Sequence, residues 1–147
     1  MSFVLIGKSL SGKTTISKAL AEKGYRWEKN YTTRPKRDGE ANDEYVYVSD
    51  EMFTDMACHD EFVDVKEFNT VHGIWKYGVL YPTTSWDKKT FVIMTPQGYV
   101  EHKNELPDDT KCIYLYANNN TIMKRMKKRG DMEEGMRRLK QDNKDLL

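Results

Sequence analysis

The segment "GKSLSGKTT" at residues 7–15 constrains the fold most, because it directly follows the apolar run "FVLI" at residues 3–6. It matches the pattern GxxxxGK[ST] through Gly7, Gly12, Lys13 and Thr14. In such a loop the glycines let backbone N–H groups curl around phosphate oxygens at the positive end of a helix. The pattern therefore predicts a buried strand, a phosphate-binding loop and then a helix over residues 13–23.

The side chains of this loop supply the other groups that a nucleoside triphosphate needs. Lys13 brings a mobile cation to the β- and γ-phosphates, and the Thr14 hydroxyl is a ligand for Mg²⁺. We therefore expect ATP with Mg²⁺, in contact with the loop residues Gly7, Ser9, Ser11, Gly12, Lys13, Thr14 and Thr15. On the loop alone, a glycine-rich turn that binds nothing is the alternative.

The composition describes one small domain with a large wetted surface. Its 147 residues are 32% charged and 38% hydrophobic, and the formal net charge is +1. So small a net charge favours neither a nucleic acid nor a membrane as partner. Cys58 and Cys112 have neither metal-site nor redox-motif spacing, which favours a reducing compartment. We expect a cytoplasmic monomer that acts on small molecules, without a signal peptide or a membrane span.

Periodicity predicts strands and helices that alternate at both ends of the chain, with an antiparallel ribbon between them. Strands are expected at residues 3–6, 25–27, 45–48, 90–94 and 112–117, and the ribbon at 61–68 and 73–80. Helices are expected at residues 13–23, 50–57, 96–106, 120–129 and from about 136 to 147, and a loop at 30–44. We expect the inward faces to carry Ile16, Ala19 and Leu20 in the first helix and Ile122, Met123 and Met126 in the fourth. This order indicates an α/β fold of three layers with a short parallel sheet and an inserted β-rich lobe.

A second informative segment, "YTTRPKRDGEANDEYVYVS", covers residues 31–49. It places Arg34 and Arg37 on either side of Pro35, a spacing suited to a bidentate grip on one phosphate. The Tyr45 hydroxyl is a further donor. On composition alone, a solvated basic loop is the alternative.

This segment resembles the part of guanylate kinases that binds GMP. The matching residues are Thr32, Thr33, Arg34, Pro35, Arg37, Gly39, Glu40, Tyr45, Val48 and Ser49. The resemblance continues in the same order through "EFVDVKEFNTVHGIWKYGV" at 61–79, "PQG" at 96–98, and "IMKRMKKRG" followed by "MRRL" in a segment that resembles the family's lid. It spans nearly the whole chain, so we identify the sequence as resembling a guanylate kinase.

The resemblance implies transfer of the ATP γ-phosphoryl group to GMP or dGMP. It implies acceptor-phosphate contacts from Arg34, Arg37, Tyr45 and Tyr77, and catalytic roles for Lys13, Arg125, Arg129 and Arg138. The base-reading carboxylate falls on Asp64 when the alignment starts from "EFV", and on Glu67 when it is counted back from Tyr77. For the basic helix, a solvated face is the alternative to a lid. The implied division of the single domain 1–147 is a core at about 1–29 and 88–124, an acceptor lobe at about 30–87, and a lid at about 125–138.

Several positions depart from the family pattern. Asn30 stands where the family has serine, and Val79 stands where it has serine or threonine. The resemblance places both positions in the acceptor-binding site. Met94, Thr95 and Pro96 replace the stretch with aspartates, so Mg²⁺ would rely on Thr14, phosphates and water. Two other functions therefore stay open. One is a kinase of the same fold with another acceptor, such as a modified deoxynucleotide or a sugar phosphate. The other is a non-catalytic binding module, a class that usually loses the loop that this chain keeps.

Overall fold

The computed structural model describes residues 2–7, 12–38, 44–82, 86, 89–129, 136 and 140. Its first sheet is parallel and consists of β1 (Phe3–Gly7), β2 (Arg26–Trp27), β7 (Thr90–Ile93) and β8 (Lys111–Leu115). The strand order is β2-β7-β1-β8, so β1 is hydrogen-bonded on both sides. A strand in that position is buried by its neighbours, which explains the continuous apolar run at the start of the chain.

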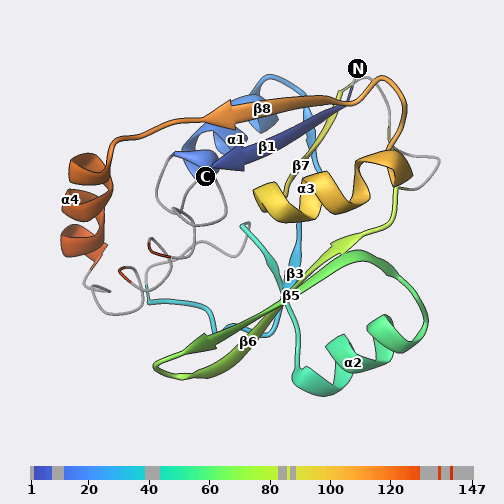
Figure 1. The fold of residues 1–147 in the computed structure, drawn as a ribbon, viewed down its shortest axis with the longest axis horizontal. Helices are drawn as coiled ribbons and strands as arrows, with labels where there is room; N and C mark the ends of the chain where they lie inside the picture. Colours follow the sequence, from blue (N-terminus) through green and yellow to red (C-terminus); the bar gives the residue numbers. More distant parts are fainter. Residues whose placement is uncertain are drawn as a thin grey trace.

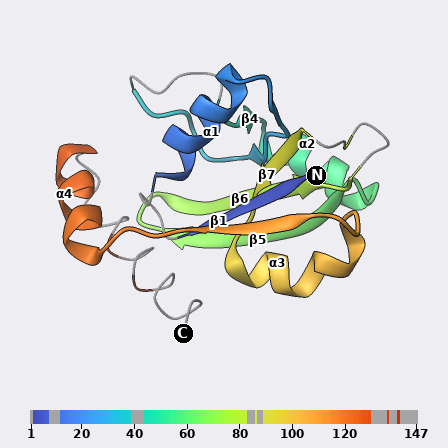
Figure 2. The same cartoon turned by 90° about the horizontal axis from the view of Figure 1, so that it is seen from above.

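Helices cover both faces of this sheet. The helix α1 (Lys13–Glu22) lies on one face, and α3 (Pro96–His102) lies on the other and continues into the short 3₁₀ helix η1 (Lys103–Glu105). The helix α4 (Asn119–Arg129) follows β8 and lies beside the sheet, at the end where β8 finishes (Figure 1). The predicted α/β fold of three layers with a short parallel sheet is confirmed (Figure 2).

The second sheet is the predicted β-rich insertion. It contains β3 (Tyr31–Thr32), β4 (Val46–Tyr47), β5 (Phe62–Thr70) and β6 (Gly73–Leu80) in the order β4-β3-β6-β5, with α2 (Asp50–Cys58) packed against it. The predicted antiparallel ribbon is confirmed as the hairpin β5–β6. The segment 30–44 is not entirely a loop, because β3 pairs with β6 and the buried Thr32 hydroxyl donates to the Lys76 carbonyl at 2.9 Å. Pairing with β6 of the hairpin thus makes part of this polar segment a strand.

One apolar cluster joins the two sheets. Its buried members are Val4, Val63, Val79, Trp86, Val92, Met94 and Leu106. Val4 and Val92 belong to the parallel sheet, whereas Val63 and Val79 belong to the hairpin. Burying these side chains together provides the main driving force that holds the hairpin on the parallel sheet.

The predicted inward face of α1 is wrong in part. Ile16 is 41% exposed and Ala19 is exposed, while Ser17 is completely buried. The Lys13 Nζ donates to the Gly7 carbonyl at 2.6 Å, which turns the Lys13 side of the helix toward the end of β1. Ser17 lies one turn further along that side, and its hydroxyl is satisfied by the Lys13 carbonyl at 2.7 Å.

In α4 the prediction holds for Ile122 and Met126, which are buried, but not for Met123, which is 40% exposed. The helix expected from about 136 to 147 falls almost entirely outside the described residues. None of the helices in the described part of the chain is long and apolar enough to cross a bilayer.

Replacing Ser49 by alanine should lower the free energy of unfolding by about 1 kcal/mol. The reason is that the Ser49 hydroxyl caps α2 by accepting from the Met52 amide at 3.1 Å. Urea unfolding measures the change. Thr54→Ala, at an exposed position inside the same helix, is the matched control and should cost nothing because alanine favours helices. An equal loss in both variants would contradict the capping role.

Candidate nucleotide site

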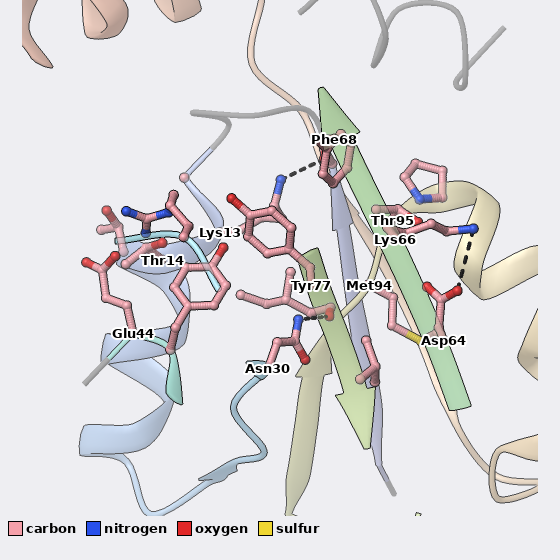
Figure 3. Close-up of a pocket in the computed structure, with 18 of the residues that line it drawn as sticks. Lys13, Thr14, Asn30, Glu44, Asp64, Lys66, Phe68, Tyr77, Met94 and Thr95 are labelled. Atoms are coloured by element: carbon pink, nitrogen blue, oxygen red, sulfur yellow. Dashed lines mark hydrogen bonds and ion pairs between the residues drawn. The ribbon is translucent and has the colours of Figure 1, made fainter. Parts of the chain in front are cut away.

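A cavity of about 680 Å³ is lined by residues of both sheets, α1 and α4. Its volume suits a nucleotide-sized ligand. The predicted site residues that line it are Gly7, Gly12, Lys13, Thr14, Thr15, Asn30, Arg34, Arg37, Tyr45, Asp64, Tyr77, Val79 and Arg125. Figure 3 shows several of them directed into the same space from different elements. Segments more than a hundred positions apart in the sequence thus meet in one cavity.

One end of the cavity is formed by the turn from β1 into α1. Gly12 is the N-cap of α1 with a φ of 105°, a left-handed conformation that a side chain would strain. A glycine cap has no side chain to occupy the first N–H groups of the helix, which leaves them for an anion. Thr14 and Thr15 follow in that first turn and line the cavity. Ser9 and Ser11 lie outside the described residues.

Arg34 is the most deeply placed cation of the cavity wall, with 2% of its surface exposed. Its guanidinium lies over the rings of Tyr45 and Tyr47, at 5.4 and 5.6 Å from their centroids. It also donates to the Pro35 carbonyl at 3.0 Å and to the Tyr47 hydroxyl at 3.5 Å. Two aromatic faces and two hydrogen bonds therefore fix the direction of a charge whose burial would otherwise be costly.

The tyrosines predicted for the acceptor phosphate meet at the same wall. The rings of Tyr45 and Tyr77 pack edge to face with their centroids 5.8 Å apart, and Tyr77 packs in the same way on Phe68 at 5.4 Å. Arg37 is half-buried and also lines the cavity. The arginines and tyrosines of one short segment are thus brought against the hairpin, as a phosphate grip requires.

The two candidate base-reading acids take different places. Asp64 on β5 is 5% exposed and lines the cavity, whereas Glu67 is exposed and is not among the lining residues. Side chains alternate along a strand, so Lys66 and Phe68 share the cavity side with Asp64 while Glu67 points to the other face. The structure brings Asp64, and not Glu67, to the other predicted site residues.

Asn30 connects this wall to the parallel sheet. Its Nδ2 donates to the Ile93 carbonyl at 2.7 Å, at the end of β7. This bond fixes the amide, and the Oδ1 is then a buried acceptor without a hydrogen-bond partner among the described residues. The departure from serine at this position therefore places an amide oxygen in the cavity wall.

Sequence reasoning did not select several lining residues, namely Glu44, Lys66, Phe68, Ile93, Met94, Thr95, Pro96 and Lys128. The sequence contained signals for four of these residues. Lys66 and Phe68 follow Asp64 with the period of a strand. Met94 and Thr95 follow a parallel strand directly, where open α/β sheets bind their ligands.

The predicted lid is described only in part. Arg125 and Lys128 of α4 line the cavity. Arg129 ends α4 with its side chain outside the described part, and Arg138 lies outside it altogether. A catalytic role for either of these two arginines stays a prediction.

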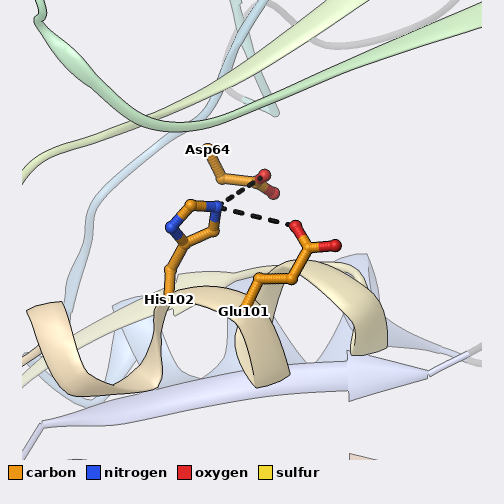
Figure 4. A group of neighbouring side chains, drawn as sticks. All are labelled: Asp64, Glu101 and His102. Atoms are coloured by element: carbon orange, nitrogen blue, oxygen red, sulfur yellow. Dashed lines mark ion pairs between the residues drawn. The ribbon is translucent and has the colours of Figure 1, made fainter.

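Asp64, Glu101 and His102 have the spacing of metal ligands, because one ligand atom from each lies within 4.8 Å of the others (Figure 4). However, the Lys66 Nζ lies 3.5 Å from Asp64 Oδ1 and 3.3 Å from Glu101 Oε2. The pKa of Glu101 is lowered, first by the hydrogen bond that Gln97 donates at 2.8 Å and then by Lys66. The lysine already compensates both acids, so we assign no metal to this cluster and keep Thr14 as the candidate magnesium ligand.

A close approach of β5 to α3 positions Asp64. A Cβ atom on Gly98 would overlap the Asp64 carboxylate and lie 3.0 Å from both its Cγ and the Thr95 Oγ1. The Thr95 hydroxyl caps α3 by accepting from the Gly98 amide at 3.0 Å. Only a glycine lets the acid, the cap and the helix occupy this space together.

Comparisons with known proteins agree with this geometry. A family model described as an AAA domain matches residues 4–145. A guanylate kinase of Fusobacterium nucleatum is 30% identical over 98% of this chain and 80% of its own length. The chain belongs to the guanylate kinase family. A guanylate kinase of Neisseria gonorrhoeae is 31% identical over 87% of the chain and 64% of its own length.

The fold of the family is found in a solved structure as well. The crystal structure of guanylate kinase from Anaplasma phagocytophilum aligns with a TM-score of 0.66 and 22% identity, over 99% of this chain and 70% of that one. At that identity the match concerns the fold. The 30% identity to the guanylate kinase of Fusobacterium nucleatum confirms, at the level of the family, the resemblance predicted from the sequence motifs.

Gly98→Ala should lower the free energy of unfolding by about 1–3 kcal/mol through overpacking against Asp64. Helix propensity alone would act in the opposite direction, since alanine is the better helix residue by about 1 kcal/mol. Urea unfolding of Gly98→Ala, Asp64→Ala and the double variant measures the effect, with Val100→Ala at an exposed α3 position as control. We expect the double variant to recover part of the loss, because removing the carboxylate makes room for the methyl group. If the losses in free energy of unfolding of the two single variants simply add in the double variant, the overlap is ruled out.

Proposed function

We propose that this protein transfers the γ-phosphoryl group of ATP to GMP or dGMP, giving ADP and GDP or dGDP. One observation carries the proposal. The glycine, lysine and threonines of the phosphate-binding turn line the same cavity as the buried arginine and the tyrosines of the inserted lobe. A site that serves two phosphorylated ligands at once needs this combination. The family of the chain points to the same reaction.

On the donor side, the backbone around Gly12 and the first turn of α1 would hold the triphosphate. Lys13 now donates to the Gly7 carbonyl, and its ammonium would turn to the β- and γ-phosphates when ATP enters. When Mg²⁺ is bound, it neutralises phosphate charge. Thr14 would hold it together with phosphate oxygens and water. Arg125 would add positive charge from α4.

On the acceptor side, Arg34, Arg37, Tyr45 and Tyr77 would bind the monophosphate. One of its anionic oxygens attacks the γ-phosphorus of ATP, a new P–O bond forms, and the bond to the bridging oxygen of ADP breaks. The attacking oxygen already carries negative charge, so no general base is required. The chain contributes by alignment and by positive charge at the transferring group.

Asp64 would read the base of the acceptor. A carboxylate accepts hydrogen bonds, and the Watson–Crick edge of guanine offers its N1–H and its 2-amino group as neighbouring donors. Adenine lacks both donors and would set its N1 acceptor against this carboxylate, which a site built for two donors rejects. The position of Asp64 on the cavity side of β5 supports this assignment over Glu67.

The remaining parts of the proposal concern organisation and setting. We assign the acceptor lobe to about residues 30–87, which contain the second sheet, the core to about 1–29 and 88–124, and the lid to about 125–138. We propose that the protein acts on small-molecule nucleotides and does so as a monomer. We place the protein in the cytoplasm, because Cys58 and Cys112 are both free and exposed.

The deciding experiment is ADP release from ATP and Mg²⁺ with a panel of ribo- and deoxynucleoside monophosphates. Turnover restricted to GMP and dGMP is the expected result. Turnover with a different base or with a sugar phosphate would assign the acceptor site to another substrate. Binding of ATP without turnover of any acceptor would favour a non-catalytic module.

Lys13→Ala should lower kcat by at least about 100-fold, the effect of removing one preorganised charge at a reacting group. Far-UV circular dichroism and the Tm should stay close to those of the wild type. Lys23→Ala, at the exposed end of the same helix, is the matched control and should retain full activity. A fully active Lys13→Ala protein would remove this lysine from the reaction.

Asp64→Asn should raise the KM for GMP by about 10- to 100-fold and reduce the preference for GMP over AMP, because a charged hydrogen-bond acceptor is lost. Glu67→Gln, the matched change on the opposite face of β5, should alter neither quantity. Steady-state kinetics with both acceptors test the pair. A selectivity change in Glu67→Gln alone would transfer the role to that residue, and none in either variant would end the guanine assignment.

A further inference from the structure

Asp64 lies against the nitrogen atoms of two side chains, His102 and Lys66, that the proposed reaction itself does not use. The His102 Nε2 lies 3.4 Å from Asp64 Oδ1, and the Lys66 Nζ lies 3.5 Å from the same oxygen. The other oxygen packs against Gly98 at the start of α3. Each oxygen of the carboxylate is therefore fixed by a different neighbour, and the 5% exposure of the residue leaves little bulk water to replace them.

The His102 ring is held in turn by two further carboxylates, those of Glu105 and Glu101. Its Nδ1 lies 2.6 Å from Glu105 Oε2, and its Nε2 also lies 3.8 Å from Glu101 Oε2. Figure 4 shows the ring between the Asp64 and Glu101 carboxylates. Both ring nitrogens therefore lie against carboxylates, which fixes the plane of the ring. Glu105 orients the ring toward Asp64, much as a carboxylate orients the histidine in other sites.

A buried polar group needs partners, because an unpaired one is costly away from water. Without His102 and Lys66, the Asp64 side chain would lose the contacts that fix its direction. A rotated carboxylate would present fewer acceptors to the two donors of guanine. The partners of Asp64 therefore bear on the recognition of the base although they do not need to touch it.

We propose that His102, oriented by Glu105 and assisted by Lys66, is a positioning residue that holds the Asp64 carboxylate in the direction needed for guanine discrimination. The inference rests on the proposed function, because it deepens the role given to Asp64 there. In this way α3 and η1, which lie outside the inserted lobe, contribute to the choice of acceptor.

Calorimetric titration of GMP and of ATP into the wild type and into His102→Ala tests the inference without requiring turnover. We expect the Kd for GMP to rise by about 5- to 20-fold, the effect of losing one charged hydrogen bond. The Kd for ATP and the kcat at saturating GMP should stay within about twofold of the wild-type values. His59→Ala is the control, because His59 is an exposed histidine beside Asp55 at the end of α2.

Glu105→Gln provides a second variant that retains the ring. It should weaken GMP binding less than His102→Ala does, and the double variant should resemble His102→Ala alone, because Glu105 acts through the ring. If the losses of GMP affinity in the two single variants simply add in the double variant, Glu105 does not act through the ring. The second variant also decides the question if His102→Ala does not fold.

The outcomes separate this inference from the proposed function. Unchanged GMP affinity in His102→Ala and Glu105→Gln would overturn the inference while leaving the kinase reaction in place. Wild-type protein that binds GMP but never releases ADP would overturn the proposed reaction, and the titrations would still decide the role of His102. Wild-type protein that binds no GMP would overturn both.

Discussion

The apolar core that the two sheets share is the constraint on which the site depends. Val63 and Val79 bring one end of the hairpin into the same cluster as Val4 and Val92 of the parallel sheet. With that end buried, the rest of the hairpin extends over the carboxyl ends of β1 and β7, where α/β sheets bind their ligands. The cavity is therefore a consequence of how the core packs, and its walls come from segments that no local pattern connects.

The parts of this arrangement that could be predicted from the sequence are those that a pattern within one short segment encodes. The turn from β1 into α1 is encoded by glycines and an apolar run within one short segment, and the hairpin is encoded by its own alternation. The choice between Asp64 and Glu67 was not local. It depends on which face of β5 meets the core and on the irregular register between Phe62 and Asp64, and both are set by residues far away in the chain.

The departures from the family pattern also have a structural reason that the sequence could not reveal. Val79 and Met94 are 6% and 2% exposed and belong to the shared core, so their side chains fill space where the family has polar groups. Asn30 bonds to the Ile93 carbonyl, 63 positions further along the chain. At these three positions the side chains join the inserted sheet to the parallel sheet.

This attachment limits how the site can close over its ligands. The inserted sheet is fixed by the common core, by the Asn30 amide and by the contact between Asp64 and Gly98, so a large hinge motion there would break buried contacts. In α4, Ile122 and Met126 are buried and pack with Ala117 and Met136. A phosphoryl transfer site must exclude water at the moment of reaction. Because α4 carries Arg125 of the cavity lining, closure of this helix over the ligands stays a prediction of the sequence.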